Sequence, residues 1–168
     1  MTSNRSSEMP VKRASRKPRK PLKKPRKLVA VKKAKLKTVM SAGNQKPSIM
    51  VVDDDESVLV LIRELLEQEG MKVMTAAGGV ECLDKLEHVK PDLLILDVMM
   101  SKITGLDVAE AVRLDPRLRN VKMIFLTVVK PTEIKPALLN RLAASDYIAK
   151  PFDNDDFVRR VRWVLTEK

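Results

Sequence analysis

The chain has 168 residues and a formal net charge of +11, which is unevenly distributed. Residues 1–47 hold 16 Lys/Arg and one acid, Glu8, for a net charge of +15, whereas residues 48–168 hold 17 Lys/Arg and 21 Asp/Glu, for a net charge of −4. No apolar run approaches the roughly 20 residues that span a bilayer, and the single cysteine, Cys82, excludes an internal disulfide or a cysteine metal cluster. We therefore expect a cytoplasmic protein without a membrane span, in which Cys82 is a small apolar helix residue and a basic tail (residues 1–47) precedes a folded domain (residues 48–168).

The basic tail is a segment of low complexity. Residues 16–27 repeat Lys, Arg and Pro, and this dense like charge with few large apolar residues predicts disorder. Binding to nucleic acid through counterion release is one interpretation, with acidic lipid or polyphosphate as a further anionic partner. The absence of interleaved aromatic residues does not support stacking on single-stranded bases. The alternative is a solvated linker, or a segment upstream of the true start, because Met40 lies just before the domain.

Residues 48–168 alternate between strand and helix patterns five times. In chain order the apolar patterns predict strand 48–52 and helix 56–69, strand 72–76 and helix 80–88, strand 92–97 and helix 105–114, strand 121–127 and helix 133–144, and strand 147–150 and helix 153–165. The run at 93–96 is apolar without alternation, which is typical of a strand buried on both faces. This order predicts an α/β fold, a doubly wound five-stranded parallel sheet with five helices.

Helical spacing assigns the inward faces of the first and last helices. In the first helix the apolar positions at this spacing are Val58, Leu61, Ile62, Leu65 and Leu66. In the last helix they are Phe157, Val158, Val161, Val164 and Leu165. Trp163 then points to the opposite side of the last helix. It is either a contact for a partner or a second copy, or a single scattered surface residue.

Four predicted strands end on a polar or charged residue. These residues are Asp53 and Asp54, Asp97, Thr127 and Lys150. Parallel strands place their carboxyl ends at one edge of the sheet, where open α/β folds form their sites. Three carboxylates at one edge repel one another, and a hard cation such as Mg²⁺ relieves that conflict. With a lysine and a hydroxyl nearby, this set favours phosphoryl transfer onto a carboxylate.

These residues, in this order and spacing, resemble the receiver domain of two-component response regulators, which has a flavodoxin-like fold. The resemblance covers residues 48–168 and rests on Val52-Asp53-Asp54, Leu96-Asp97, Thr127 and Lys150-Pro151-Phe152. It implies that Asp97 accepts a phosphoryl group from a histidine kinase or phosphotransfer protein. It also implies that Mg²⁺ is bound by Asp54, by Asp53 either directly or through a water molecule, by Asp97, and by the backbone carbonyl of Met99.

The resemblance further assigns a switch. Thr127 and Lys150 would contact the phosphoryl group, and the Lys150–Pro151 peptide would be cis. Tyr147 would move with Thr127. This movement would change the face formed by the fourth helix, fifth strand and fifth helix, on which a downstream protein would bind.

The sequence departs from the family pattern near the acceptor. Ser101 stands where the family usually has proline after methionine, Thr104 where it usually has aspartate, and Val128 where it usually has a small residue. Val128 could narrow the access to Asp97 or hinder Thr127. Met99 and Val129, each two positions after a site residue, are apolar and orient no attacking water, so we expect a long-lived phosphoryl group.

We therefore expect a stand-alone receiver that is not an enzyme and has no C-terminal output domain. The alternative function is a DNA-binding architectural or regulatory protein whose basic tail is the effector and whose receiver modulates it. A phosphatase of the haloacid-dehalogenase type is rejected because Met99 stands where that class has an acid. A homodimer remains open, because Asp146, Arg159 and Arg162 loosely resemble polar positions of dimerising receivers.

Overall fold

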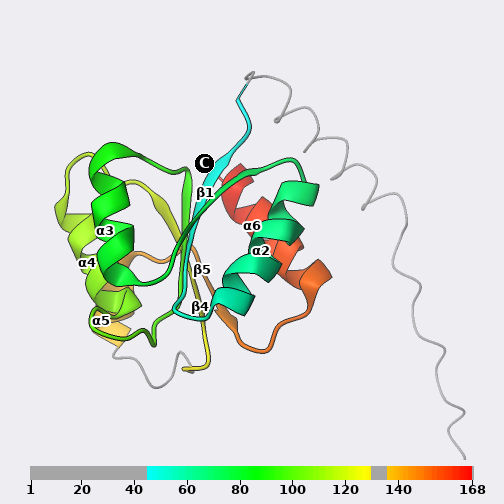
Figure 1. The fold of residues 1–168 in the computed structure, drawn as a ribbon. Coiled ribbons are helices and arrows are strands. Elements are labelled where there is room, and N and C mark those ends of the chain that lie inside the picture. Colours follow the sequence, from blue (N-terminus) through cyan, green and yellow to red (C-terminus); the bar gives the residue numbers. More distant parts are fainter. Residues whose placement is uncertain (1–44, 130–135, 168) are drawn as a thin grey trace, which may run out of the picture.

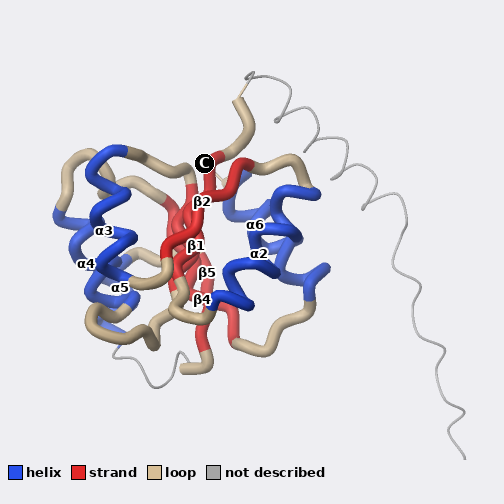
Figure 2. Tube along the Cα trace, in the orientation of Figure 1, coloured by secondary structure: helices blue, strands red, loops and turns tan. Residues whose placement is uncertain are grey.

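The computed structural model describes residues 45–129 and 136–167, and these form a five-stranded parallel sheet between two helical layers (Figures 1 and 2). The elements in chain order are β1 (Ser48–Val52), α2 (Glu56–Gln68), β2 (Lys72–Ala76), α3 (Gly79–His88), β3 (Leu93–Leu96), α4 (Gly105–Leu114), β4 (Lys122–Thr127), α5 (Pro136–Leu142), β5 (Asp146–Ala149) and α6 (Asn154–Thr166). The predicted fold class is confirmed. The predicted tail lies outside the described residues except for 45–47, as do residues 133–135 of the fourth predicted helix.

The sheet has the strand order β2-β1-β3-β4-β5, with every neighbouring pair parallel. Strand β3 is therefore central, and its four side chains are at most 1% exposed. This burial on both faces explains the absence of alternation in its sequence. The order places β1, β3, β4 and β5 side by side, so their carboxyl ends meet at one edge.

Two apolar layers hold the helices against the sheet. One layer joins α3, α4 and α5 to one face, and the other joins α2 and α6 to the opposite face (Figure 1). Cys82 belongs to the first layer, where its thiol lies 3.8 Å from the sulfur of Met50. Burial raises the pKa of this thiol to about 12. The prediction that Cys82 is a small apolar filler is thereby confirmed.

The inward face of α2 differs from the predicted one at two positions. Leu61 is 40% exposed, whereas Leu59, which the spacing argument left out, is only 6% exposed. The buried face is centred on Leu59, Ile62 and Leu66. Seven of the nine residues from Val58 to Leu66 are apolar, which is more than the sheet can bury, so the packing angle selects which of them stay exposed.

The inward face of α6 agrees with its prediction. Phe157, Val161 and Val164 are fully buried, and Val158 and Leu165 pack against the same layer. Trp163 is 51% exposed on the opposite side. None of the helices in the described part of the chain combines the length and apolar character needed to cross a bilayer.

Candidate functional site

The predicted site residues Asp53, Asp97 and Lys150 lie just beyond the carboxyl ends of β1, β3 and β5. Main-chain hydrogen bonds continue the ladder through them: Asp97 N–H donates to Val52 O at 2.9 Å, and Lys150 N–H donates to Thr127 O at 3.0 Å. Their backbones are therefore as firmly placed as those of the strands. The structure confirms that the polar strand ends gather at one edge of the sheet.

The ammonium group of Lys150 bridges two carboxylates. Its Nζ lies 2.5 Å from Oδ2 of Asp53 and 2.8 Å from Oδ2 of Asp97. Asp53 and Asp97 are 2% and 7% exposed, so both acids are taken out of water. Burial raises the pKa of Asp53, although the hydrogen bond from Lys150 opposes this. Burial alone would lower the pKa of Lys150, but the bonds to Asp53 and Asp97 outweigh it and raise that pKa.

The third acid, Asp54, completes a set with the residue types of a cation site. One carboxylate oxygen from each of Asp53, Asp54 and Asp97 lies within 4.8 Å of the others. Asp53 and Asp97 are buried, whereas Asp54 is exposed. Carboxylate oxygens with an open, solvent-facing side suit Mg²⁺, which keeps several water ligands. The chain's own residues therefore fit a magnesium ion at this edge.

The three consecutive acids have two different roles: Asp53 and Asp54 belong to the acidic site, whereas Asp55 caps helix α2. Asp55 is the N-cap of α2, where its side chain accepts the N–H of Ser57 at 2.9 Å. Its own N–H donates to Oδ1 of Asp53 at 3.0 Å. A cluster of acids before a helix has a plain structural explanation in the helix dipole. Here that explanation accounts for Asp55 but not for Asp53, which points to Lys150.

Main-chain N–H groups of the loop that follows Asp97 donate hydrogen bonds to two of the site carboxylates. The N–H of Met99 donates to Oδ1 of Asp97 at 3.0 Å, and the N–H of Ser101 donates to Oδ2 of Asp54 at 3.0 Å. The Met99 side chain is 59% exposed. The predicted role of its carbonyl as a metal ligand stays a prediction. The Ser101 contact was missed, because a main-chain donor leaves no mark in a pattern of side chains.

The start of α4 is fitted closely against the acceptor strand. A Cβ atom on Gly105 would lie 2.0 Å from the carbonyl oxygen of Asp97, so only glycine fits there. Thr104 is the N-cap of α4 and forms a capping box with Asp107. Thr104, which departs from the family pattern, is thus a good helix cap. Sequence reasoning marked Gly105 only as a helix start.

Thr127 and Tyr147 are linked through the backbone after β4. Thr127 is fully buried, and its Oγ1 accepts the N–H of Val129 at 3.3 Å. The hydroxyl of Tyr147 donates to the carbonyl of Val129, and its ring lies 6.1 Å from that of Phe125. Val128 is 65% exposed, so it does not pack into the core beside Thr127. Its effect on access to Asp97 stays a prediction.

The polar positions considered for dimerisation all have partners within the chain. Asp146 binds Arg160 with both carboxylate oxygens, and Arg160 also donates to the carbonyl of Tyr147 at 2.8 Å. Arg159 pairs with Asp156, and Arg162 pairs with Glu69, the C-cap residue of α2. The Arg160–Asp146 pair therefore joins α6 to β5, and the Arg162–Glu69 pair joins α6 to the end of α2, whereas the Arg159–Asp156 pair lies within α6.

Comparison with known proteins decides the family of this site. The chain matches the response regulator receiver domain over residues 49–162. The chain belongs to this family. The Lys150–Pro151 peptide is cis, as the resemblance implied. Receiver domains bind Mg²⁺ at their acidic pocket, and the site described above fits that property.

Two proteins similar to this receiver are named as transcriptional regulatory proteins. The chain is 39% identical over 120 residues to PhoP of Bacillus subtilis, the alkaline phosphatase synthesis transcriptional regulatory protein. The matched region covers 70% of this chain and 48% of PhoP. The chain is 40% identical over 117 residues to CpxR of Escherichia coli, with 70% and 48% covered. The chain thus spans about half the length of the curated relatives it matches.

Solved structures share the receiver fold. The response regulator TrrA of Thermotoga maritima, in complex with Mg²⁺ and BeF, is 32% identical with a TM-score of 0.62, covering 70% of this chain and 98% of that one. The chemotaxis response regulator CheY4 of Vibrio cholerae is 28% identical with a TM-score of 0.66, covering 71% and 99%. In these two cases the receiver accounts for nearly the whole of the solved chain.

Proposed function

We propose that Asp97 accepts a phosphoryl group from a phosphohistidine of a histidine kinase or phosphotransfer protein. A carboxylate oxygen of Asp97 forms the new bond to phosphorus as the bond from phosphorus to the donor imidazole nitrogen breaks, and that nitrogen keeps the electron pair. The observation that carries this proposal is the shared ammonium of Lys150, 2.8 Å from Asp97 and 2.5 Å from Asp53. It supplies positive charge where the transferred oxygens would lie.

The remaining site residues support the same step. Asp53, Asp54, Asp97 and the carbonyl of Met99 would hold Mg²⁺, which when bound supplies a second positive charge that neutralises phosphoryl oxygens. The Thr127 hydroxyl would hydrogen-bond one phosphoryl oxygen and release the N–H of Val129 that it accepts now. Since Tyr147 donates to the carbonyl of Val129, this change would reach Tyr147 directly.

The output of the proposed switch is the face formed by α5, β5 and α6. Tyr147 lies on β5, and the exposed Trp163 lies on α6. We propose that a downstream protein binds this face and that the chain acts in the cytoplasm as a phosphorylation-switched receiver rather than as an enzyme. The exposed Trp163 supports a protein partner, since aromatic residues are enriched in the cores of interfaces.

Phosphorylation is tested on the purified full-length chain with acetyl phosphate and Mg²⁺, followed by intact-protein mass spectrometry. We expect the addition of one phosphoryl group, which hydroxylamine removes because an aspartyl phosphate is a reactive acyl phosphate. With apolar Met99 and Val129 beside the site, the group should persist for many minutes. No hydroxylamine-sensitive adduct would contradict the proposed function, and a half-life of seconds would contradict the proposed lifetime alone.

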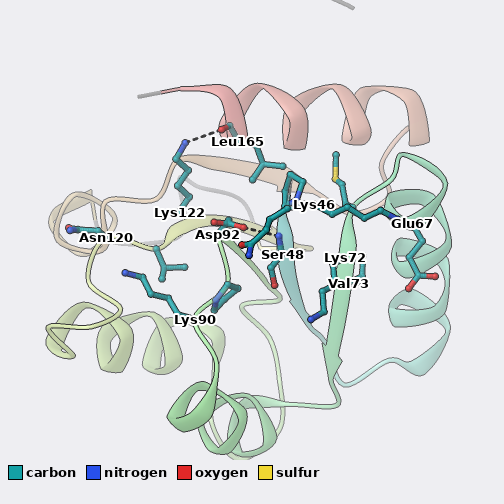
Figure 3. Close-up of a pocket in the computed structure, with 15 residues that line it drawn as sticks. Lys46, Ser48, Glu67, Lys72, Val73, Lys90, Asp92, Asn120, Lys122 and Leu165 are labelled. Atoms are coloured by element: carbon teal, nitrogen blue, oxygen red, sulfur yellow. Dashed lines mark hydrogen bonds between the residues drawn. The ribbon is translucent and has the colours of Figure 1, made fainter. Parts of the chain in front are cut away.

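A second candidate function, nucleic-acid binding, is favoured by a hollow at the opposite edge of the sheet. This hollow, the lysine hollow, has a volume of about 1120 Å³ and is lined by four of the seven lysines in residues 45–129 and 136–167 (Figure 3). These are Lys46, Lys72, Lys90 and Lys122. The tail, with 15 Lys/Arg in residues 1–44, joins the domain beside Lys46.

The charges of the lysine hollow are mixed but mainly positive. Two acids also line it, Glu67 and Asp92, and Asp92 accepts the N–H of Ser48 at 2.8 Å. The Nζ of Lys122 donates to the carbonyl of Val164 at 2.7 Å, so the other three lysines are the cations of the hollow that could turn toward a ligand. None of the residues that line the hollow is aromatic, so it suits the phosphates of a duplex rather than stacked bases.

A salt titration of duplex DNA binding tests this second function. The full-length chain is compared with the triple variant K46Q/K72Q/K90Q and with the control K102Q, which changes a lysine in the loop after β3. If the hollow binds phosphates, the triple variant should flatten the plot of log K against log salt by about 0.9 for each phosphate that it no longer neutralises. An unchanged slope would assign binding to the tail alone, and no binding by any protein would contradict the second function.

A further inference from the structure

The Asp54 carboxylate depends on one main-chain donor. Asp53 and Asp97 are buried and share Lys150, whereas Asp54 is exposed. Within residues 45–129 and 136–167, the hydrogen bond found for its carboxylate is the one from the N–H of Ser101, 3.0 Å from Oδ2. An exposed aspartate without such a bond samples several rotamers. The Ser101 N–H therefore holds Asp54 in the position from which its oxygen lies within 4.8 Å of those of Asp53 and Asp97.

The donor is itself fixed by the loop that carries it. The N–H of Ile103 donates to the carbonyl of Ser101 at 2.9 Å, and Lys102 between them has φ of +67°. These values describe a tight three-residue turn. Ile103 is seated on the first residue of α3, because a Cβ on Gly79 would lie 2.8 Å from the Ile103 side chain. The turn is thus held in place by the contact between Ile103 and α3. In the Ser101–Asp54 hydrogen bond, the Asp54 side chain is therefore the part that is free to move.

We propose that the main-chain N–H of Ser101 is a positioning donor for Asp54, which sets the affinity of the acidic site for Mg²⁺. This inference rests on the proposed function. A carboxylate has about four lone-pair sites, so a donor on Oδ2 leaves Oδ1 available for a cation. Hydrogen bonds to ligating carboxylates orient them, and their loss typically weakens metal binding about 10- to 100-fold.

The donor is specific to the residue type at this position. Ser101 stands where the family pattern usually has proline, and proline has no N–H to donate. The departure from the pattern therefore adds a contact to the site. The same loop would then contribute to Mg²⁺ binding in two ways. The carbonyl of Met99 would be a ligand, and the N–H of Ser101 would position the ligand Asp54.

The test uses Mg²⁺ alone, titrated into the full-length chain and followed by calorimetry. The variant Ser101→Pro removes the N–H, and Ser101→Ala keeps it while removing the hydroxyl. We expect Ser101→Pro to weaken Mg²⁺ binding about 10-fold or more, and Ser101→Ala to restore binding to within about twofold of the parent. Equal affinities for the parent and the proline variant would overturn the inference, as would equal losses in both variants.

A second measurement does not depend on how well the proline variant folds. Amide hydrogen exchange of Ser101, read by NMR in metal-free protein, should be slow in the parent and fast in Asp54→Ala, which leaves the loop sequence unchanged. Unchanged exchange in Asp54→Ala would overturn the inference. If the parent chain bound no Mg²⁺ while Ser101 exchange still depended on Asp54, the failure would lie in the proposed metal site, and the claim that Ser101 sets its affinity would fall with it.

Discussion

The carboxyl edge and the amino edge of the sheet are formed by opposite ends of the same strands, but their charged side chains have different surroundings. At the carboxyl edge the charged groups are withdrawn from water and pair with one another, as Lys150 does with Asp53 and Asp97. At the amino edge charged side chains stay exposed or bond to the main chain, as Asp92 does with Ser48 (Figure 3). Only at the carboxyl edge should the loss of one charged group strongly destabilise the others, because charges interact more strongly where water is excluded.

The largest expected contrast uses the two ends of β3. Asp92 precedes this strand and Asp97 follows it, so the same substitution can be made at both edges. Asp97→Asn should abolish phosphorylation by acetyl phosphate, a loss of at least about 100-fold, because an amide is a poor nucleophile. Asp92→Asn should leave it intact. Intact-protein mass spectrometry measures both, and labelling of Asp97→Asn at the parent rate would show that the acceptor lies elsewhere.

The next contrast concerns two lysines. Lys150→Met should lower the free energy of unfolding by about 3 kcal/mol in metal-free protein, because it leaves two buried carboxylates uncompensated. Lys122→Met should cost about 1 kcal/mol, the loss of hydrogen bonds to the end of α6. Urea denaturation measures both values. Equal losses would mean that the two edges do not differ in the way proposed.

The pH dependence of the Lys150 contribution follows from its raised pKa. Since pairing raises the folded pKa above the ordinary value of 10.5, the stabilisation is complete below that value and is lost as pH rises through the folded pKa. The difference between the parent and Lys150→Met should therefore be constant from pH 7 to about 9 and shrink only in stronger base. A difference that fell between pH 7 and 9 would contradict this assignment.

A third contrast compares two glycines. Gly105→Ala at the carboxyl edge would place Cβ against the Asp97 carbonyl and should cost about 2–3 kcal/mol, with slower phosphorylation as the acceptor shifts. Gly70→Ala at the amino edge meets no atom within 4 Å, but its φ of +81° should cost about 1 kcal/mol, without an effect on phosphorylation. Thermal unfolding and acetyl phosphate labelling separate the two. A normal labelling rate in Gly105→Ala would remove the link between this contact and the acceptor.

The smallest expected effect concerns the reactivity of Cys82, which lies in the core between the two edges of the sheet. Its buried thiol has a pKa raised to about 12, so it should remain protonated and unreactive toward iodoacetamide at pH 8 in the folded chain. In urea the same thiol should react at the rate of a free cysteine. Because the folded state favours the protonated thiol, this group should lower stability as pH rises above the ordinary value of 9.0. Rapid labelling of the native chain would show that the layer of α3 opens locally.

Most of the site could be predicted because it is made of side chains at strand ends. Asp53, Asp97, Thr127 and Lys150 each follow or end an apolar run, and the parallel order brings those ends together. The contacts of Ser101 and Gly105 could not be predicted in the same way. Each involves a main-chain atom, whose position depends on the path of a loop rather than on a pattern of residue types.

The inward face of α2 gives a similar lesson about the fold. Its spacing correctly predicted a helix and placed Ile62 and Leu66 inside, but it chose Leu61 where the structure buries Leu59. Periodicity defines an apolar arc, whereas the angle at which the helix meets the sheet decides the margin of that arc. Predictions at the centre of a face were therefore more accurate than those at its border.

The sequence by itself determined the order of strands and helices, the central buried strand, and which side chains reach the carboxyl edge. These follow from local periodicity and from the handedness of parallel crossovers, which leave few alternatives. The tertiary structure decided which charges meet: that Lys150 bridges Asp53 and Asp97, that Asp55 caps α2, and that Asp54 is held by the N–H of Ser101. Those pairings depend on distances of a few ångströms between segments up to 97 residues apart, and only the packed core sets such distances.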